Sequence, residues 1–379
     1  MPGTISPSDL YHGISSGSIP FMLDVRNQDE FAAWPVEGTK PVPTKNVPVW
    51  LAVEQVSELA AELPSNTVVI CARGNGSAML LEMLAEEGVE ARSLEGGTAA
   101  WAELLVPQHL DCLPDGMVGW QVLRPSKACI SYVIGIPGKK AVVVDPARYV
   151  DFYVDLARQH DLEIAHVIDT HVHADHVSGG PQLAQTVGAA YHLPLEDTGG
   201  SVPFPNIPLE DGVSIDLGGS PEMAVTTVAI KMPGHTPGTT CIHIPDHLLL
   251  TGDTVFVRGV GRPDLTGQAE ELARELFYTV HEKLRPLTGS TVILPAHWSQ
   301  LDEVRDDGIV ATTVKEIFSS TLMSEEDMVA FVKEIVSSLP SAPDFYDTIR
   351  EVNAGKQVSE EEIETLEIGK NQCAAPTTT

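Results

Sequence analysis

The sequence predicts a two-domain α/β protein, and three observations support this class. Its 379 residues exceed the usual size of a single domain. Short apolar strands alternate with amphipathic helices in two separate blocks, which is typical of domains built around parallel strands. A stretch without periodicity that carries two prolines separates the blocks. We therefore expect domains at residues 1–106 and 118–320, joined by a linker at 107–117.

The first block has a cysteine between a strand and a helix. Residues 21–25 (FMLDV) and 67–71 (TVVIC) read as short buried strands, and a helix is expected over 77–87. Cys71 begins the glycine-rich loop CARGNGS. Such a loop can direct backbone N–H groups at the sulfur, and the helix N-terminus adds positive charge that favours a thiolate or persulfide. The alternative, an inert buried cysteine, is less consistent with this placement.

The second block begins with a hairpin and ends in helices. Residues 132–146 (YVIGIPGKKAVVVDP) read as two apolar strands around a Pro-Gly turn, and a strand at 164–169 follows. A C-terminal helical extension is expected at 321–356, with a capping-box-like helix start at Ser324. Residues 357–379 are expected to form a flexible tail.

Composition excludes several classes of partner. The net charge of −30 repels nucleic-acid phosphates and anionic lipid, so neither a nucleic acid nor a membrane is expected as a partner. The five scattered cysteines do not suggest a disulfide framework. Neither a secretory leader nor an apolar run of about 18 residues is recognisable. We therefore expect a cytoplasmic protein.

A histidine-rich loop is the most specific chemical feature of the sequence. A single histidine is more often structural than a metal ligand, but four donors within six residues favour a zinc or iron site. These donors follow the strand at 164–169, and four more lie where other strands end, the usual place for α/β active sites. The eight residues are His171, His173, Asp175 and His176 in the loop, with Asp145, His235, Asp253 and His297 elsewhere.

Together these positions resemble the metallo-β-lactamase superfamily over about residues 118–300. The resemblance implies an αββα fold that binds metal. Two branches share the residues: glyoxalase II-like thioester hydrolases bind two metals, whereas persulfide dioxygenases bind a single iron. The segment 251–265 (TGDTVFVRGVGRPDL) is similar to the dioxygenase branch. One departure is His297-Trp298-Ser299, where that branch usually has His-Asp-Tyr.

The resemblance also implies a set of ligands. One Fe(II) per chain would be bound by His171, His235 and Asp253, a triad that leaves positions open for a sulfur atom and O₂. Four of the five remaining residues would orient ligands and substrate from outside or, in the zinc-dependent hydrolase alternative, complete a second metal site. These four are His173, Asp175, His176 and His297.

Three further residues are candidates for binding substrate: Arg258, Arg262 and Thr236. A guanidinium group suits the carboxylates of glutathione or the charge of a persulfide, because it can form two parallel hydrogen bonds. An ion pair with an acidic neighbour is an equally weighted alternative for both arginines.

The first block resembles single-domain rhodaneses over about residues 5–105. The matching pieces include Leu23-Asp24-Val25-Arg26, the loop that starts at Cys71, and Leu94-Glu95-Gly96-Gly97. Rhodaneses carry sulfur as a cysteine persulfide, which implies catalytic roles for Cys71, Arg73 and Arg26. Gly76 stands where the loop commonly has an arginine, and Arg73 is the candidate to supply that charge.

The fusion of the two blocks favours persulfide chemistry, because tethering keeps a reactive intermediate at high effective concentration. The sequence thus predicts iron-dependent oxidation of glutathione persulfide or a similar thiol persulfide to sulfite. Sulfur transfer with thiosulfate or sulfite would proceed through Cys71. The alternatives are a zinc-dependent thioester hydrolase with a degenerate rhodanese domain, and a non-catalytic sulfur sensor. The metal, the thiol carrier, the direction of sulfur transfer and homo-oligomer formation stay open.

Overall fold

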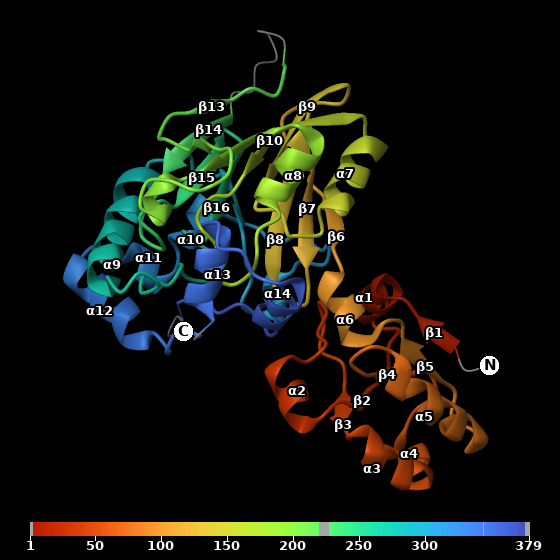
Figure 1. Ribbon diagram of the computed structural model, residues 1–379. Coiled ribbons are helices and arrows are strands. Elements are labelled where there is room, and N and C mark those ends of the chain that lie inside the picture. Colours follow the sequence, from red (N-terminus) through yellow and green to blue (C-terminus); the bar gives the residue numbers. More distant parts are fainter. Residues whose placement is uncertain (1–2, 220–226, 344, 376–379) are drawn as a thin grey trace. The chain divides into compact units, whose positions relative to one another are not determined.

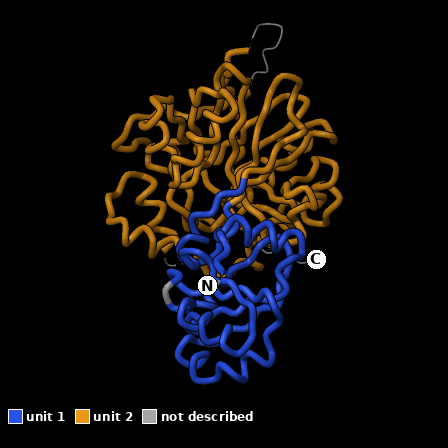
Figure 2. The backbone as a smooth tube through the Cα atoms, turned by 90° about the vertical axis from the view of Figure 1, so that its right-hand side faces the viewer, with its two compact units in different colours: residues 1–106, 124–127, 368–370 blue, residues 107–123, 128–367, 371–379 orange. Residues whose placement is uncertain are grey.

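The computed structural model describes residues 3–219, 227–343 and 345–375. The chain forms two compact units, which Figure 2 distinguishes by colour. Unit 1 consists of Met1–Val106, Arg124–Lys127 and Ile368–Lys370, and unit 2 of Pro107–Leu123, Ala128–Glu367 and Asn371–Thr379. Unit 1 is therefore completed by two short segments from later in the sequence.

Unit 1 is built on a five-stranded parallel sheet with strand order β1-β5-β4-β2-β3. In chain order the strands are β1 (Gly3–Ile5), β2 (Met22–Asp24), β3 (Thr44–Asn46), β4 (Thr67–Ile70) and β5 (Ala91–Leu94). The helices are α1 (Pro7–Ser16), α2 (Gln28–Ala33), α3 (Val49–Glu54), α4 (Val56–Glu62), α5 (Asn75–Glu86) and α6 (Gly97–Glu103). The first block is thus the small α/β domain that its strand–helix alternation predicts (Figure 1).

The central strand of unit 1 explains why the Cys71 loop has a fixed position. All four residues of β4 are buried, as expected for an apolar strand that lies between parallel neighbours. Leu80 and Leu84 of α5 pack in the same core as Val69. Cys71 follows the strand directly, so packing on both sides holds the start of its loop.

Unit 2 contains two sheets, whose orders are β12-β11-β10-β9-β8-β7-β6 and β13-β14-β15-β16-β17-β18. The first sheet consists of β6 (Val106–His109), β7 (Val118–Arg124), β8 (Cys129–Gly135), β9 (Lys139–Val144), β10 (Leu162–Ile168), β11 (Ala190–Leu193) and β12 (Ile207–Pro208). The second consists of β13 (Ser214–Ile215), β14 (Thr227–Lys231), β15 (Thr240–Ile244), β16 (Leu248–Gly252), β17 (Val292–Pro295) and β18 (Thr312–Thr313). The predicted hairpin is β8–β9, an antiparallel pair.

Helices cover the two sheets on their outer sides, which gives the expected αββα layers (Figure 1). Helices α7 (Val150–Gln159) and α8 (Gly180–Val187) pack against β10. On the other sheet, Leu276 of α9 (Ala269–Tyr278) shares a core with Cys241 and Leu249, and α12 (Met328–Ser338) packs on α9. The remaining helices are the π-helical turn Thr279–Leu284, the 3₁₀ turns Leu195–Thr198 and Leu301–Glu303, α10 (Val314–Ile317), α11 (Thr321–Ser324), α13 (Tyr346–Asn353) and α14 (Glu360–Leu366).

The structure differs from the predicted C-terminal region in two respects. Ser324 ends α11 and does not begin a helix; the cap of α12 is Asp327, whose carboxylate accepts hydrogen bonds from two backbone N–H groups. Of the expected flexible tail at 357–379, residues 376–379 lie outside the described residues, and residues 357–375 are ordered. They form α14 and then pack inward, so that Cys373 is fully buried. The carboxylate of Glu367 fixes this segment because it accepts a hydrogen bond from Val177 N at 2.9 Å.

The structure also differs from the expected linker at 107–117, because this stretch begins inside β6, the edge strand of the seven-stranded sheet.

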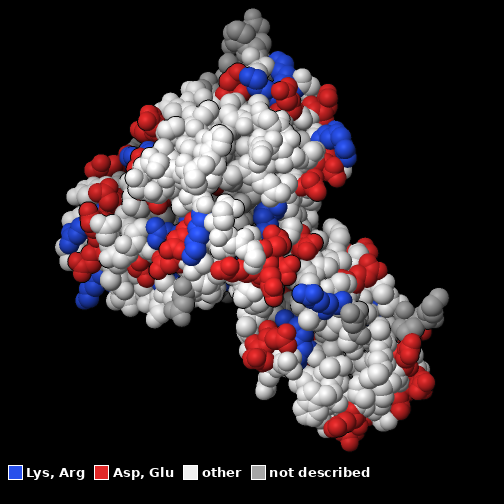
Figure 3. Space-filling model, viewed as in Figure 1, with Lys and Arg blue, Asp and Glu red and all other residues white. Residues whose placement is uncertain are grey.

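On the face that Figure 3 shows, acidic side chains are spread over the surface of both units and do not form one patch. Within the described ranges, no helix combines the length and the apolar character that crossing a membrane requires.

Candidate metal centre

The ends of several strands in unit 2 bring the predicted donors together. The loop 170–176 follows β10 of the seven-stranded sheet. His235 lies in the turn after β14, and Asp253 directly follows β16, both in the six-stranded sheet. β16 is buried along its whole length, and β10 is buried at its last two residues, so packing of these strands fixes where the donors just beyond them lie. The centre is therefore built from both sheets.

His171, His235 and Asp253 form a convergent group that we call the triad. All three side chains are fully buried. Asp253 Oδ2 lies 3.7 Å from His171 Nε2 and 3.4 Å from His235 Nε2. None of these three atoms has a hydrogen-bond partner among the described residues. Buried polar atoms are normally paired, so three unpaired acceptors that face one another need a further explanation.

The contacts behind the two histidines direct their lone pairs inward. His235 Nδ1 lies 2.9 Å from the carbonyl oxygen of Arg262, which can only accept, so Nδ1 carries the proton. Thr170 Oγ1 donates to Asp145 Oδ2 and therefore accepts from His171 Nδ1, 3.0 Å away. Both histidines consequently present an unprotonated Nε2 to the triad, the form in which imidazole binds metal.

Electrostatics keeps the third member of the triad charged. Although burial alone raises the pKa of Asp253, the neighbouring histidines, His297 first among them, hold this pKa well below its usual value. Both ring nitrogens of His297 face carboxylates: Nδ1 lies 2.6 Å from Asp253 Oδ1, and Nε2 lies 3.0 Å from Asp175 Oδ2. Burial lowers the pKa of His297, but these two carboxylates raise it well above its ordinary value.

The triad fits a metal ion. Two neutral imidazoles and one carboxylate are the donor set that zinc and iron accept, and a bound cation would satisfy all three unpaired atoms at once. A glycine lets the chain pass close to this group: a Cβ at Gly261 would lie 1.9 Å from Asp253 O and 2.9 Å from His235 Nδ1. The residues present are therefore suited to one metal ion.

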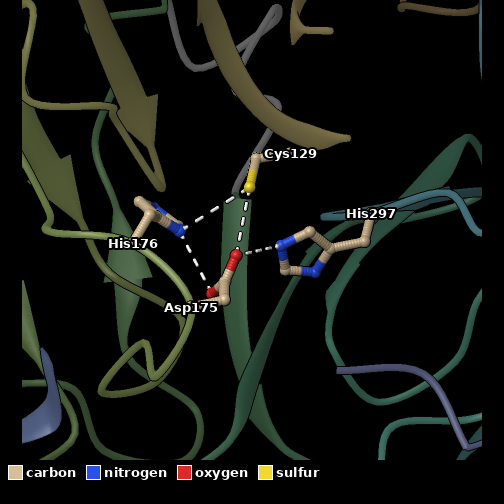
Figure 4. Close-up of side chains that lie close together, drawn as sticks. All are labelled: Cys129, Asp175, His176 and His297. Carbon is tan, nitrogen blue, oxygen red and sulfur yellow. Dashed lines mark hydrogen bonds and ion pairs between the residues drawn. The ribbon is translucent and has the colours of Figure 1, made fainter. Parts of the chain in front are cut away.

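A second group of donors, the Cys129 cluster, consists of Cys129, Asp175, His176 and His297 (Figure 4). His297 links this cluster to the triad through Asp253. The donor atoms of the cluster already bond to one another. Asp175 Oδ2 accepts from Cys129 Sγ at 3.1 Å and faces His297 Nε2, while Asp175 Oδ1 lies 3.1 Å from His176 Nδ1. This cluster thus differs from the triad, because its donors pair internally.

His173 joins neither group. Its Nε2 lies 3.2 Å from Asp145 Oδ1 and 3.9 Å from Asp169 Oδ1. Burial lowers the pKa of His173, but the charge and hydrogen bond of Asp145, with the charge of Asp169, raise it to about 9. Burial also raises the pKa of Asp169, to about 6. Of the eight predicted donors, the structure therefore places three in the triad, three in the Cys129 cluster, and His173 with Asp145 in a third group.

Several residues at the centre were not identified from the sequence. Asp197 joins the histidine loop to the turn of His235, since its carboxylate accepts from Val172 N at 3.1 Å and Gly238 N at 2.7 Å. Asn353 of α13 donates to the carbonyl oxygens of His173 and His176, both at 2.9 Å. The residues missed are Asp169, Asp197, Asn353, Cys129 and Cys373, and the last lies within 4.8 Å of donor atoms of Asp253 and His297. No local motif marks them, because most of their contacts, such as those of Asn353 and Cys129, are distant in sequence.

The three predicted substrate-binding residues all have protein partners. Arg258 forms an exposed ion pair with Asp302, with hydrogen bonds of 3.0 and 2.7 Å. Arg262 is fully buried, and its guanidinium group bonds Asp264 and the carbonyl oxygen of Pro340. The hydroxyl of Thr236 donates to Asp197 at 2.8 Å. The ion-pair alternative therefore describes the contacts of both arginines in this structure.

The Cys71 loop of unit 1 has the expected form. Gly74 N donates to Cys71 Sγ at 3.0 Å, and the hydroxyl of Ser77 lies 3.4 Å from the sulfur. Helix α5 begins at Asn75, so its positive end lies beside the sulfur. A pocket of about 330 Å³ adjoins Cys71 and is also lined by Arg26 and Arg73. An anion could therefore approach the sulfur there.

Arg26 lines that pocket, but its guanidinium group already forms hydrogen bonds within the protein. Its guanidinium group donates to Asp24 Oδ2 at 2.6 Å and to the carbonyl oxygen of Trp34 at 2.9 Å, and the side chain is buried. Arg73 is the exposed cation of the loop. Both arginines therefore line the pocket beside Cys71, Arg26 from a buried position and Arg73 from an exposed one.

Comparison with known proteins agrees with this architecture. Residues 127–311 match the family model of the metallo-beta-lactamase superfamily, and residues 6–104 match that of the rhodanese-like domain. The persulfide dioxygenase ETHE1 of Bos taurus is 31% identical over 180 residues, which cover 47% of this chain and 66% of that protein. Slightly less than two thirds of that relative is therefore represented here.

Two further proteins share the second domain. BaeB of Bacillus velezensis, described as a probable polyketide biosynthesis zinc-dependent hydrolase, is 30% identical over 173 residues, covering 44% of this chain and 71% of BaeB. The crystal structure of a metallo-beta-lactamase from Staphylococcus aureus superposes with a TM-score of 0.58 at 26% identity, covering 65% of this chain and 75% of that one. The chain thus belongs to the metallo-β-lactamase superfamily, with a rhodanese-like domain preceding that fold in the sequence.

Proposed function

We propose that this chain oxidises the terminal sulfur of a thiol persulfide, such as glutathione persulfide, to sulfite at one Fe(II) bound by His171, His235 and Asp253. One persulfide, one O₂ and one water would give one thiol, one sulfite and two protons. The rhodanese-like domain would transfer sulfane sulfur through Cys71 between a thiol persulfide and sulfite, so that one persulfide and one sulfite give one thiol and one thiosulfate, or the reverse. The enzyme would therefore combine a persulfide dioxygenase with a sulfurtransferase.

The observation that carries this proposal is the contrast between the triad and the Cys129 cluster. Three buried acceptor atoms of the triad lack partners and face one another, whereas the donors of the Cys129 cluster pair internally. That pattern favours one metal ion bound by two histidines and one carboxylate, the arrangement typical of non-haem iron oxygenases. The similarity to a persulfide dioxygenase supports the same reaction.

Each residue at the centre would have a defined task. Bound Fe(II) would supply the redox chemistry that allows O₂ to react with the sulfur atom. Thr170 and the carbonyl oxygen of Arg262 hold the two imidazoles with Nε2 directed inward. His297 holds a proton between Asp253 and Asp175, which keeps Asp253 charged and fixes its orientation.

Metal content and O₂ consumption test the proposal together. We expect protein purified without oxygen and without added metal to contain about one iron per chain and to consume O₂ rapidly with glutathione persulfide. Two zinc ions per chain with no O₂ uptake would refute the dioxygenase. Apo-protein reconstituted with Fe(II) or with Zn(II) is the matched control, because only the iron form should consume O₂.

Two variants test the division of labour between the domains. His171→Ala should abolish O₂ uptake and leave sulfur transfer from thiosulfate intact, because the two sites belong to different domains. Cys71→Ser should do the opposite. Loss of both activities from either substitution, in a protein that is still folded, would show that the tasks are not divided in this way.

A zinc-dependent thioester hydrolase is the second candidate. Cys129, Asp175, His176 and His297 offer donor atoms that all lie within 4.8 Å of one another, close enough to hold a second ion if their mutual hydrogen bonds were broken. The similarity to a probable zinc-dependent hydrolase supports this alternative. Hydrolysis of S-lactoylglutathione by the two-zinc form would establish it.

A further inference from the structure

We propose that Asp145 and Asp169 hold His173 out of the metal centre and thereby restrict the centre to two imidazoles and one carboxylate. The inference rests on the proposed single-metal centre and names the residues that make it so. These two aspartates are positioning residues, because they would act on the metal through histidines: both face His173, and Asp145 also holds Thr170, which orients His171.

His173 lies next to the triad residue His171, but its Nε2 faces two aspartates. It lies two residues beyond His171 in the same loop, and the centroids of the two rings are 4.2 Å apart. Its Nε2 nevertheless faces Asp145 Oδ1 at 3.2 Å and Asp169 Oδ1 at 3.9 Å. Facing a carboxylate, this nitrogen must carry a hydrogen, so it has no lone pair to offer a metal.

The carboxylates of Asp145 and Asp169 have fixed positions, because other groups donate hydrogen bonds to them. Asp145 accepts from Thr170 N at 2.7 Å and from Thr170 Oγ1 at 2.9 Å. Asp169 Oδ2 accepts from the hydroxyls of Ser178 at 2.6 Å and Tyr191 at 2.7 Å. They therefore form a fixed anionic receptor, and both side chains are buried, where charge is screened only weakly.

Two features show that this orientation is imposed. His173 Nδ1 is buried without a hydrogen-bond partner among the described residues, which is costly for a polar atom. Asp145 has a φ of 52°, in the left-handed region that non-glycine residues rarely adopt. The attraction of the two carboxylates for His173 must outweigh the cost of its unpaired Nδ1, so weakening that attraction should release the ring.

Substituting both aspartates by asparagine, with cobalt as the probe, tests this inference. Asparagine keeps the size of the side chain and an acceptor oxygen, and it tolerates positive φ, but it removes the charge. We expect Co(II) bound to the Asp145→Asn/Asp169→Asn protein to show altered d–d absorption bands from a third imidazole. Its zinc affinity should rise by about tenfold or more, the lower end of what outer contacts of a metal site contribute.

The matched control is His173→Gln, alone and combined with the two asparagine substitutions. In the wild-type background it should leave the cobalt spectrum and the metal content unchanged, and in the triple variant it should reverse the gain in zinc affinity. A changed spectrum for His173→Gln alone would overturn the inference, because His173 would then already be a ligand. An unchanged spectrum and zinc affinity for the double variant would overturn it as well.

Two further measurements keep the outcomes distinct. Asp169→Asn alone preserves both contacts of Asp145 with Thr170, so it should fold normally and give a smaller change in the same direction. No change in that variant, with its cobalt site intact, would count against the inference even if the double variant failed to fold. Persulfide-dependent O₂ uptake is measured separately on wild-type iron protein, so its absence would refute the dioxygenase without altering the count of ligands to cobalt.

Discussion

The triad and the Cys129 cluster are neighbouring groups of buried donors with opposite hydrogen bonding. They share His297 as a link, since this residue contacts Asp253 on one side and Asp175 on the other. In the triad, outer contacts occupy the Nδ1 atoms and leave three inward atoms unpaired. In the Cys129 cluster the donors bond one another. The difference shows that partners behind the donors, not residue types alone, decide where a metal ion fits.

Removing a member of the triad should have the largest effect. His235→Ala deletes one of the three proposed ligands, so we expect metal content to fall below detection and O₂ uptake to drop by on the order of 10³-fold or more. Elemental analysis and oxygen electrode measurements check this, with sulfur transfer by Cys71 as the internal control. A variant that keeps a full complement of iron would remove His235 from the triad.

Breaking the link between the two groups should have an intermediate effect. His297→Gln removes the proton that lies between Asp253 and Asp175, so Asp253 loses its fixed orientation. We expect metal affinity to fall by about 10- to 100-fold, as is usual for outer contacts of metal ligands. Competition with a chelator measures this change. His247→Gln, at an exposed position, is the control and should leave the affinity as it is.

Altering the Cys129 cluster alone should have a small effect. Cys129→Ser keeps a donor to Asp175 Oδ2 but removes the sulfur, so we expect one metal per chain and a change in O₂ uptake of no more than about threefold. Cys241→Ser controls for the loss of a buried thiol elsewhere, because Cys241 lies in neither group. Loss of a bound zinc ion from Cys129→Ser would show that the cluster is a metal site.

The smallest expected effect concerns a carboxylate outside both groups. Burial raises the pKa of Glu303 from 4.5 to about 7, opposite in direction to Asp253. The folded chain therefore binds this proton more tightly than the unfolded chain, and the resulting stability is lost as pH rises from about 4.5 to about 7. Glu303→Gln should gain on the order of 1 kcal/mol relative to wild type between pH 5 and pH 8.

Denaturant unfolding of both proteins at each pH measures the effect. Glutamine keeps an acceptor for the N–H groups of Ser299 and Gln300, so the comparison isolates the charge. A difference in the free energy of unfolding that stays constant from pH 5 to pH 8 would show that Glu303 does not titrate in this range.

Some errors of sequence interpretation have a common physical cause. The acidic C-terminal segment has no apolar periodicity, which favours a flexible tail, yet Glu367 and Cys373 are buried. Burial there depends on partners such as Val177 N, distant in sequence. The Ser-x-x-Asp pattern at Ser324 is typical of a helix start, but the cap of α12 is Asp327, because its carboxylate accepts hydrogen bonds from two backbone N–H groups. Local patterns cannot rank such competitors.

The sequence by itself determined where strands end and which donors stand there. Apolar runs followed by His or Asp predicted the strand ends of His171 and Asp253, and the glycine-rich segment predicted the Cys71 loop. Only the tertiary structure decided the roles of the donors. His171 and His173 are the same residue type two positions apart, yet Thr170 turns one toward Asp253, and Asp145 with Asp169 turns the other away. The physical reason is that a lone pair is directional, and its direction is set by partners brought together in folding.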